Sequence, residues 1–202
     1  MDTTSILLIV LVITALTVVG LLGVVFGRQR TKRLQEKFGP EYERTIHEVG
    51  DQRRAEHELK ARLEHVKALE IHPLSVEEID LYTARWQATQ MEFVDEPLTA
   101  MQKADQLIAE VMQAKGYPVE DFEQQVADIS VDYPDLVMDY RGLHLIAVKG
   151  DEENVSTEKM RQAMVHGRAL FENLVKSAES VEELVVDGEV VEEAEEKKED
   201  AS

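Results

Sequence analysis

The stretch ILLIVLVITALTVVGLLGVVF, residues 6–26, is apolar over its whole length. It contains no charged residue and no proline, and its most polar side chains are Thr14 and Thr17. As a helix it would span roughly 31 Å, close to the roughly 30 Å hydrocarbon core of a bilayer. A buried helix of a globular domain seldom stays apolar on every face over such a length. The stretch therefore predicts a transmembrane helix over residues 6–27, held in the lipid bilayer.

The flanks of this stretch predict its orientation. A cleaved signal peptide, the main alternative, needs a basic n-region and a small-residue cleavage site, and residues 1–5 (MDTTS) contain no Lys or Arg. Residues 28–38 (RQRTKRLQEKF) instead hold five basic residues and one acidic residue. Basic residues beside a span stay in the cytoplasm. We therefore expect a short extracytoplasmic N-terminus at residues 1–5, a basic juxtamembrane segment at 28–39 and a cytoplasmic C-terminal region.

Two glycines in this stretch bear on self-association. Gly23 and Gly27 form a GxxxG pattern. Small residues four positions apart let two membrane helices approach closely, but they also occur in spans without a partner. The pattern leaves both a homo-oligomer and a single span open.

Beyond residue 39 the sequence has the pattern of an all-α domain. Apolar residues recur every three or four positions, which marks one face of a helix. Residues 28–176 show no strand-like alternation and no Asn-Gly or Asp-Gly hairpin turn. We expect a bundle of about five to six helices over residues 40–176. Prolines separate the segments at Gly39-Pro40, His72-Pro73, Glu96-Pro97, Tyr117-Pro118 and Tyr133-Pro134.

Local signals place several helix ends. One apolar face runs from Pro40 to about Ile71, across Gly50, and predicts a single helix there. Ser75 and Glu78 have the spacing of a capping box. We expect Asp95 or Glu96 to cap the following helix, whose 3.6-residue period ends before Gly116, the expected C′ residue.

The charge distribution excludes one class of partner. The chain has 22 basic and 41 acidic residues, and residues 41–176 alone hold 15 basic and 28 acidic ones. Such a surface repels phosphates, so no nucleic acid is expected as a partner. Residues 177–202 hold two basic and eleven acidic residues and no aromatic residue. This composition predicts a disordered acidic tail, with a weak helix or partner-binding segment at residues 181–191 left open.

No sequence motif predicts chemistry. The chain has no cysteine, no Gly-rich phosphate loop and no GxSxG. Its six histidines include neither an HxxxH nor an HExxH pair, so solvated or singly bonded histidines are the favoured interpretation. We therefore expect no catalytic, cofactor-binding or metal-binding residues, no cofactor and no enzyme activity.

Polar residues gather in one region that gives an alternative. A functional interpretation makes them line a polar pocket formed by Asp128, Asp132, Tyr140, Arg141 and His144. The favoured interpretation makes Asp132 a helix cap and Arg141 an ion-pair partner of Asp128 or Asp139. Trp86, the single tryptophan, lies on an apolar helix face and is expected in the core, with a binding hot spot as the alternative.

Four long motifs resemble a family of uncharacterised bacterial proteins, many with one N-terminal membrane helix before a helical domain. The motifs are FGPEYERTIHEVGDQRRAEHELKAR, WQATQMEFVDEPLTAMQKADQLIAEVMQAKGYPVEDFEQQVADISVDYP, YRGLH and STEKMRQAMVHGRALFENL. The resemblance covers about residues 38–175 and implies a bacterial protein with no known activity to transfer. It also implies a tyrosine where this chain has Gly167, so that a surface contact or part of a packing patch would be missing there.

These observations predict a single-pass protein of the bacterial inner membrane. Its cytoplasmic helical domain would act as an interaction or adaptor module for a protein partner at the membrane. The alternative is a small-ligand-binding or enzymatic helical domain with its pocket at residues 128–144.

Overall fold

The computed structural model describes residue 11 and residues 28–150 and 155–176. All secondary structure in these residues is helical, which confirms the all-α class. None of the helices within the described ranges is long and apolar enough to cross a membrane. The predicted span, apart from Leu11, and the predicted acidic tail at 177–202 lie outside the described residues.

The chain divides into two compact units, residues 1–61 and 62–202. In the first unit, residues 28–38 are helical and are followed by α2 (Pro40–Val49) and the start of α3 (Gln52–Ala68). The expectation of one helix from Pro40 to Ile71 is wrong. Gly50 takes the left-handed conformation at φ 73° and its N–H donates to Ile46 O at 2.8 Å, which ends α2.

One carboxylate organises the polar contacts of the first unit. Glu56 Oε1 accepts hydrogen bonds from Thr31 Oγ1 at 2.9 Å, Tyr42 Oη at 3.1 Å and Gln52 Nε2 at 2.9 Å. Burial alone raises the pKa of Glu56, but these three hydrogen bonds together lower that pKa below its ordinary value. The ionised form of Glu56 is therefore favoured by folding.

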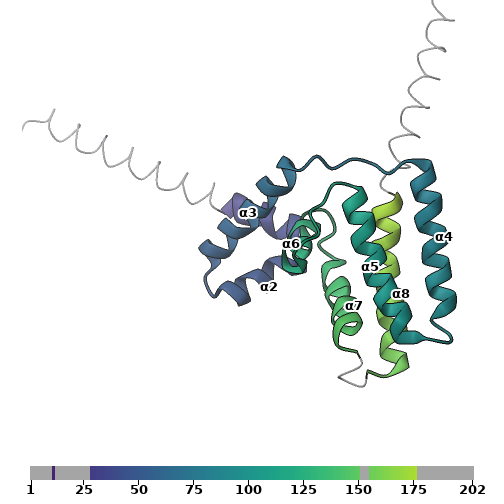
Figure 1. Cartoon of the computed structure of the whole chain (residues 1–202). Helices are drawn as coiled ribbons and strands as arrows, with labels where there is room; N and C mark the ends of the chain where they lie inside the picture. The colour runs from purple at the N-terminus through teal and green to yellow at the C-terminus, as the bar shows by residue number, and fades with distance from the viewer. Residues whose placement is uncertain (1–10, 12–27, 151–154, 177–202) are drawn as a thin grey trace, which may run out of the picture. The chain divides into compact units, whose positions relative to one another are not determined.

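The second unit contains the remaining helices, and Figure 1 shows α4, α5, α7 and α8 packed beside one another. The helices are α4 (Val76–Glu92), α5 (Pro97–Ala114), α6 (Phe122–Asp132), α7 (Val137–Lys149) and α8 (Thr157–Lys176). α5 contacts α4, α7 and α8, so it lies at the centre of this unit. Its buried face is correspondingly wide and consists of Ala100, Met101, Ala104, Leu107, Ile108, Val111 and Met112.

The helix ends of the second unit confirm two predicted signals. Ser75 caps α4 through a complete capping box, in which Ser75 N donates to Glu78 Oε2 and Ser75 Oγ accepts from Glu78 N. Gly116 follows α5 at φ 97°, and the N–H of Tyr117 donates to Met112 O, as in a Schellman motif. Glu96 stands at the N-cap of α5, but its side chain forms no capping hydrogen bond.

The close approach of α7 and α8 depends on Gly167. A Cβ atom at Gly167 would overlap Leu143 Cδ1 and lie 3.8 Å from Ile108 Cδ1. Leu143 is fully buried, so this space is already filled. The expectation that Gly167 leaves a packing patch incomplete is therefore wrong, because the glycine is itself part of a tight helix contact.

Candidate functional site

The predicted polar residues lie on two consecutive helices. Asp128 and Asp132 belong to α6, while Tyr140, Arg141 and His144 belong to α7. α6 begins at the cap Asp121, whose side chain accepts from Gln124 N at 2.8 Å, and α6 packs on α7. The polar residues therefore share one part of the second unit, but the structure distributes them over different contacts.

Asp128 is a fully buried carboxylate. Its Oδ1 accepts a hydrogen bond from Gln124 Nε2 at 2.8 Å. Its Oδ2 lies 3.6 Å from His65 Nε2 and has no hydrogen-bond partner among the residues that the structure describes. Burial raises the pKa of Asp128, although Gln124, His65 and Arg62 oppose that rise. Burial of the ionised carboxylate therefore costs stability. Functional sites often contain such a group, and so do some purely structural ion pairs.

Asp132 is itself exposed, but it lies beside two buried residues, Tyr117 and Lys115. Tyr117 Oη donates to Asp132 Oδ2 at 3.0 Å, and burial together with the charge of Asp132 raises the pKa of Tyr117. Lys115 is 3% exposed, and burial lowers its pKa while the charge of Asp132 opposes that change. Asp132 lies in the last turn of α6, so the expectation that it caps the following helix is wrong.

The α7 residues bond to other partners. Tyr140 Oη donates to Gln125 Oε1 at 3.1 Å, and Gln125 Nε2 in turn donates to Val119 O at 2.7 Å. Arg141 forms an ion pair with Glu123 at 2.7 Å, whereas the sequence predicted Asp128 or Asp139 as its partner. Burial raises the pKa of Tyr140, as does the charge of Asp105.

Of these five residues, His144 forms the contact that most resembles part of an acid–base site. Its Nδ1 lies 2.9 Å from Asp105 Oδ2 on α5, and Phe122 stacks on its ring with centroids 3.5 Å apart and planes 12° from parallel. Phe122 also contacts the ring of Tyr140 at 5.4 Å. A carboxylate that orients an imidazole is a common element of acid–base sites, but it also stabilises helix packing.

The five polar residues proposed to line one pocket thus form separate contacts in the structure. Tyr140 and His144 share Phe122, whereas Asp128 and Asp132 bond with Gln124 and Tyr117. Within the part of the chain that the structure describes, no group of three or more His, Asp and Glu residues could hold a metal ion.

Sequence reasoning missed the partners that complete these contacts. Asp105 lies within α5 and interrupts its apolar run. Lys115 directly follows α5 and borders the same run. A charged residue beside a buried helical stripe is a signal of a buried ion pair, and it could have indicated both residues.

No family model, curated protein or solved structure matches this chain. The resemblance to a bacterial family that the four sequence motifs indicate therefore stays a prediction.

Proposed function

We propose that the chain is a membrane-anchored interaction module. Residues 6–27 would anchor it in the bacterial inner membrane with the N-terminus outside, and the helical region would meet a protein partner in the cytoplasm. Anchoring confines the helical region to a thin layer, which raises its effective concentration toward other membrane-bound proteins. This arrangement favours weak docking surfaces over tight ones.

The outer face of α4 is the observation that supports an interaction function. Four apolar residues follow one another there at spacings of three, four and three: Leu81, Ala84, Ala88 and Met91, which we call the α4 stripe. Leu81 is 54% exposed and Met91 70% exposed, and both alanines are exposed as well. Alternating spacings of three and four are those with which one helix packs along another.

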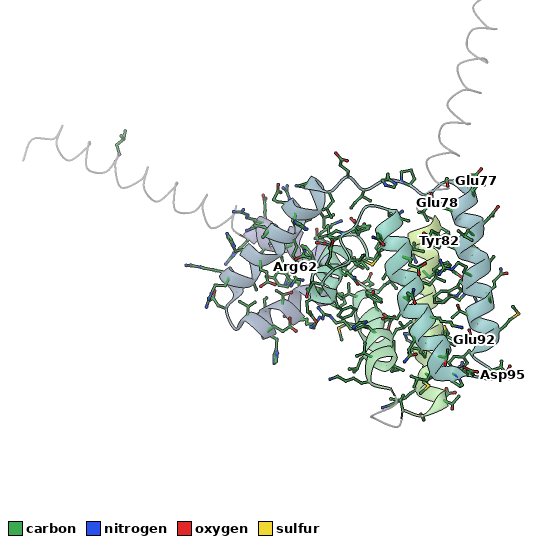
Figure 2. The ribbon with its side chains drawn as sticks, in the orientation of Figure 1. Arg62, Glu77, Glu78, Tyr82, Glu92 and Asp95 are labelled. Carbon is green, nitrogen blue, oxygen red and sulfur yellow. The ribbon has the colours of Figure 1, made fainter. Side chains whose placement is uncertain are left out.

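Carboxylates stand at both ends of the α4 stripe. Glu77 and Asp80 lie at its start, and Asp95 and Glu96 lie just beyond its end. Figure 2 shows Glu77 and Glu78 at one end of α4 and Glu92 and Asp95 at the other. Among the described residues, no ion pair is formed by four of these carboxylates, Glu77, Asp80, Asp95 and Glu96.

The shape and charge of this face suit one kind of partner. A partner helix with small or medium apolar residues on one face would cover the α4 stripe, and Lys or Arg residues at its two ends would meet the carboxylates. A second copy of α4 suits the face less well, because any antiparallel pairing would bring its acidic ends together. We therefore propose a basic amphipathic helix as the partner.

Two designed peptides test this function on the purified full-length chain. One peptide is helical with a Leu/Ala stripe and Lys at both ends, and the other has Glu in place of each Lys. Fluorescence anisotropy should show binding of the Lys peptide, weakening with salt, and Leu81→Asp should weaken it by about tenfold. Leu145→Asp, a similarly exposed leucine on α7, is the matched control. Equal binding of both peptides, or an equal effect of the control, would contradict the proposal.

A reporter fusion tests the orientation. A reporter that is active only in the cytoplasm, fused after Ser202, should be active in cells. Activity of an extracytoplasmic reporter at the same position would contradict the proposed topology.

The alternative of a ligand-binding or enzymatic domain has one observation in its favour, the oriented imidazole of His144 beside Asp105. A thermal-shift screen of metabolites and metals tests it. A compound that stabilises the wild type but not the His144→Ala variant would support this alternative.

A further inference from the structure

A cavity of about 210 Å³ lies between α4 and α8. Its apolar wall includes Trp86 and Phe171, whose rings stack with centroids 4.5 Å apart, together with Ile79 and Val175. Thr83, Gln87 and Gln90 add uncharged polar groups from α4. The wall thus suits a hydrocarbon group with polar atoms at one side.

Trp86 also has an unused hydrogen-bond donor. Its side chain is 3% exposed, and its Nε1 is buried without a hydrogen-bond partner in the described residues. The indole N–H can only donate, so the group it lacks is an acceptor. Because this nitrogen is almost wholly covered by protein atoms, an acceptor in the cavity does not reach it, and Trp86 contributes apolar ring surface to the cavity.

The side chains that line this cavity carry a net positive charge, whereas the second unit as a whole carries a net negative charge. Arg168 Nε lies 2.6 Å from Glu172 Oε1, and Lys176 Nζ lies 3.7 Å from Glu172 Oε2, so two cations share one carboxylate. All three residues line the cavity. Residues 62–176 as a whole hold 11 basic and 22 acidic residues. An excess cation on such a surface attracts an anion to this place.

We propose that this cavity binds a small apolar carboxylic acid. The hydrocarbon part would lie against Trp86 and Phe171, and the carboxylate would face Arg168 and Lys176. The volume equals about seven water molecules at about 30 Å³ each, which is below the roughly 300–1,000 Å³ of drug-sized sites. A chain of the size of octanoate fits these limits, whereas a nucleotide does not.

Fluorescence of the full-length chain provides a direct test, because Trp86 is its single tryptophan. Octanoate, octanamide and octylammonium have similar chains but differ in charge and in acceptor groups. Octanoate should change the Trp86 emission saturably and at the lowest concentration, octanamide at a higher one, and octylammonium should not bind. A saturable response to octylammonium equal to that of octanoate, or no response to octanoate, would overturn the proposal.

Variants identify the groups that are responsible. Arg168→Gln combined with Lys176→Gln should weaken octanoate binding by about tenfold or more and leave octanamide almost unchanged. Arg161→Gln is the matched control, since Arg161 lies on the same helix, pairs with Glu158 at 2.7 Å and does not line the cavity. Circular dichroism would verify that all variants keep their helicity. Equal weakening by the control, or equal loss of octanamide binding in the double variant, would contradict a carboxylate site.

The size of the acid that enters the cavity needs one further measurement. Oleate has a much longer chain than octanoate and exceeds the limit set by the volume of the cavity. Octanoate should therefore bind, whereas oleate from phosphatidylcholine vesicles should not change the Trp86 emission saturably. Tighter binding of oleate than of octanoate would contradict this cavity as the site.

Discussion

The rings of Trp86 and Phe171 stack almost in parallel, with planes 14° apart and centroids separated by 4.5 Å. Trp86 belongs to α4 and Phe171 to α8, and both side chains are buried in the core of the second unit. α4 packs mainly on α5, so this stack is a principal contact between α4 and α8. The core position expected for Trp86 from its apolar helix face is confirmed.

Removal of this ring should be costly. We expect Trp86→Ala to lower the free energy of unfolding by about 3–5 kcal/mol, because a large buried side chain is lost and a cavity remains. Trp86→Phe should cost much less, since it keeps stacking and removes the unpaired N–H. Urea unfolding followed by circular dichroism measures both. A loss below about 1 kcal/mol for Trp86→Ala would show that the ring contributes little to the core.

Two glycines within helices should respond oppositely to alanine. Gly142 on α7 is exposed, and a Cβ atom there meets nothing within 4 Å, so Gly142→Ala should stabilise by about 0.5–1 kcal/mol through helix propensity. Gly167→Ala has the same gain, but its Cβ meets Leu143, and overpacking costs about 1–3 kcal/mol. Thermal unfolding should therefore give Gly167→Ala a lower melting temperature than Gly142→Ala. Equal melting temperatures would show that Leu143 moves aside freely.

The sequence could predict what is local in the chain. The Ser75 capping box, the left-handed Gly116 and the helical class all follow from residues a few positions apart, and all are confirmed. The break at Gly50 was missed because the apolar face continues across it. His144 and Asp105 are 39 positions apart on different helices, so their contact depends on packing that no local pattern contains.

Gly116 should tolerate alanine less well than Gly50. Both have positive φ, which costs any residue with a Cβ about 1–2 kcal/mol. At Gly50 the added Cβ meets nothing within 4 Å, whereas at Gly116 it lies 2.5 Å from the backbone oxygen of Glu70, which cannot rotate away. Denaturant titration should thus show a larger loss for Gly116→Ala. A loss no greater than that of Gly50→Ala would mean that the segment at Glu70 shifts without cost.

Glu56 should stabilise the chain only above acidic pH. Its pKa is lower in the folded state than in the unfolded state, where a glutamate titrates at about 4.3. The stabilisation is therefore complete above that unfolded value and is lost as the pH falls through the folded one. Glu56→Gln should destabilise at pH 7 and match the wild type in strong acid, while the exposed Glu36→Gln should have little effect. A pH-independent difference between Glu56→Gln and the wild type would contradict this assignment.

Asp128 should show the opposite dependence. Burial raises its pKa in the folded state, so folding favours the protonated form, and ionisation costs stability as the pH rises through the folded pKa. Asp128→Asn mimics the neutral form and can still accept the hydrogen bond from Gln124. We expect this variant to be more stable than the wild type at pH 7 and to lose that advantage below the unfolded pKa of about 3.9. Asp132→Asn should give no such gain, because it weakens the contact with Tyr117 and removes the anion near Lys115.

The sign of the Asp128→Asn effect at pH 7 also bears on the alternative function. A gain in stability would mean that the chain holds a destabilising carboxylate 3.6 Å from His65, as functional sites often do, and would make this pair the next target of ligand screening. A loss would mean that His65 and Arg62 together favour the anion more than burial opposes it. In that case Asp128 is a structural ion-pair residue, and His65→Ala should destabilise the chain to a similar extent.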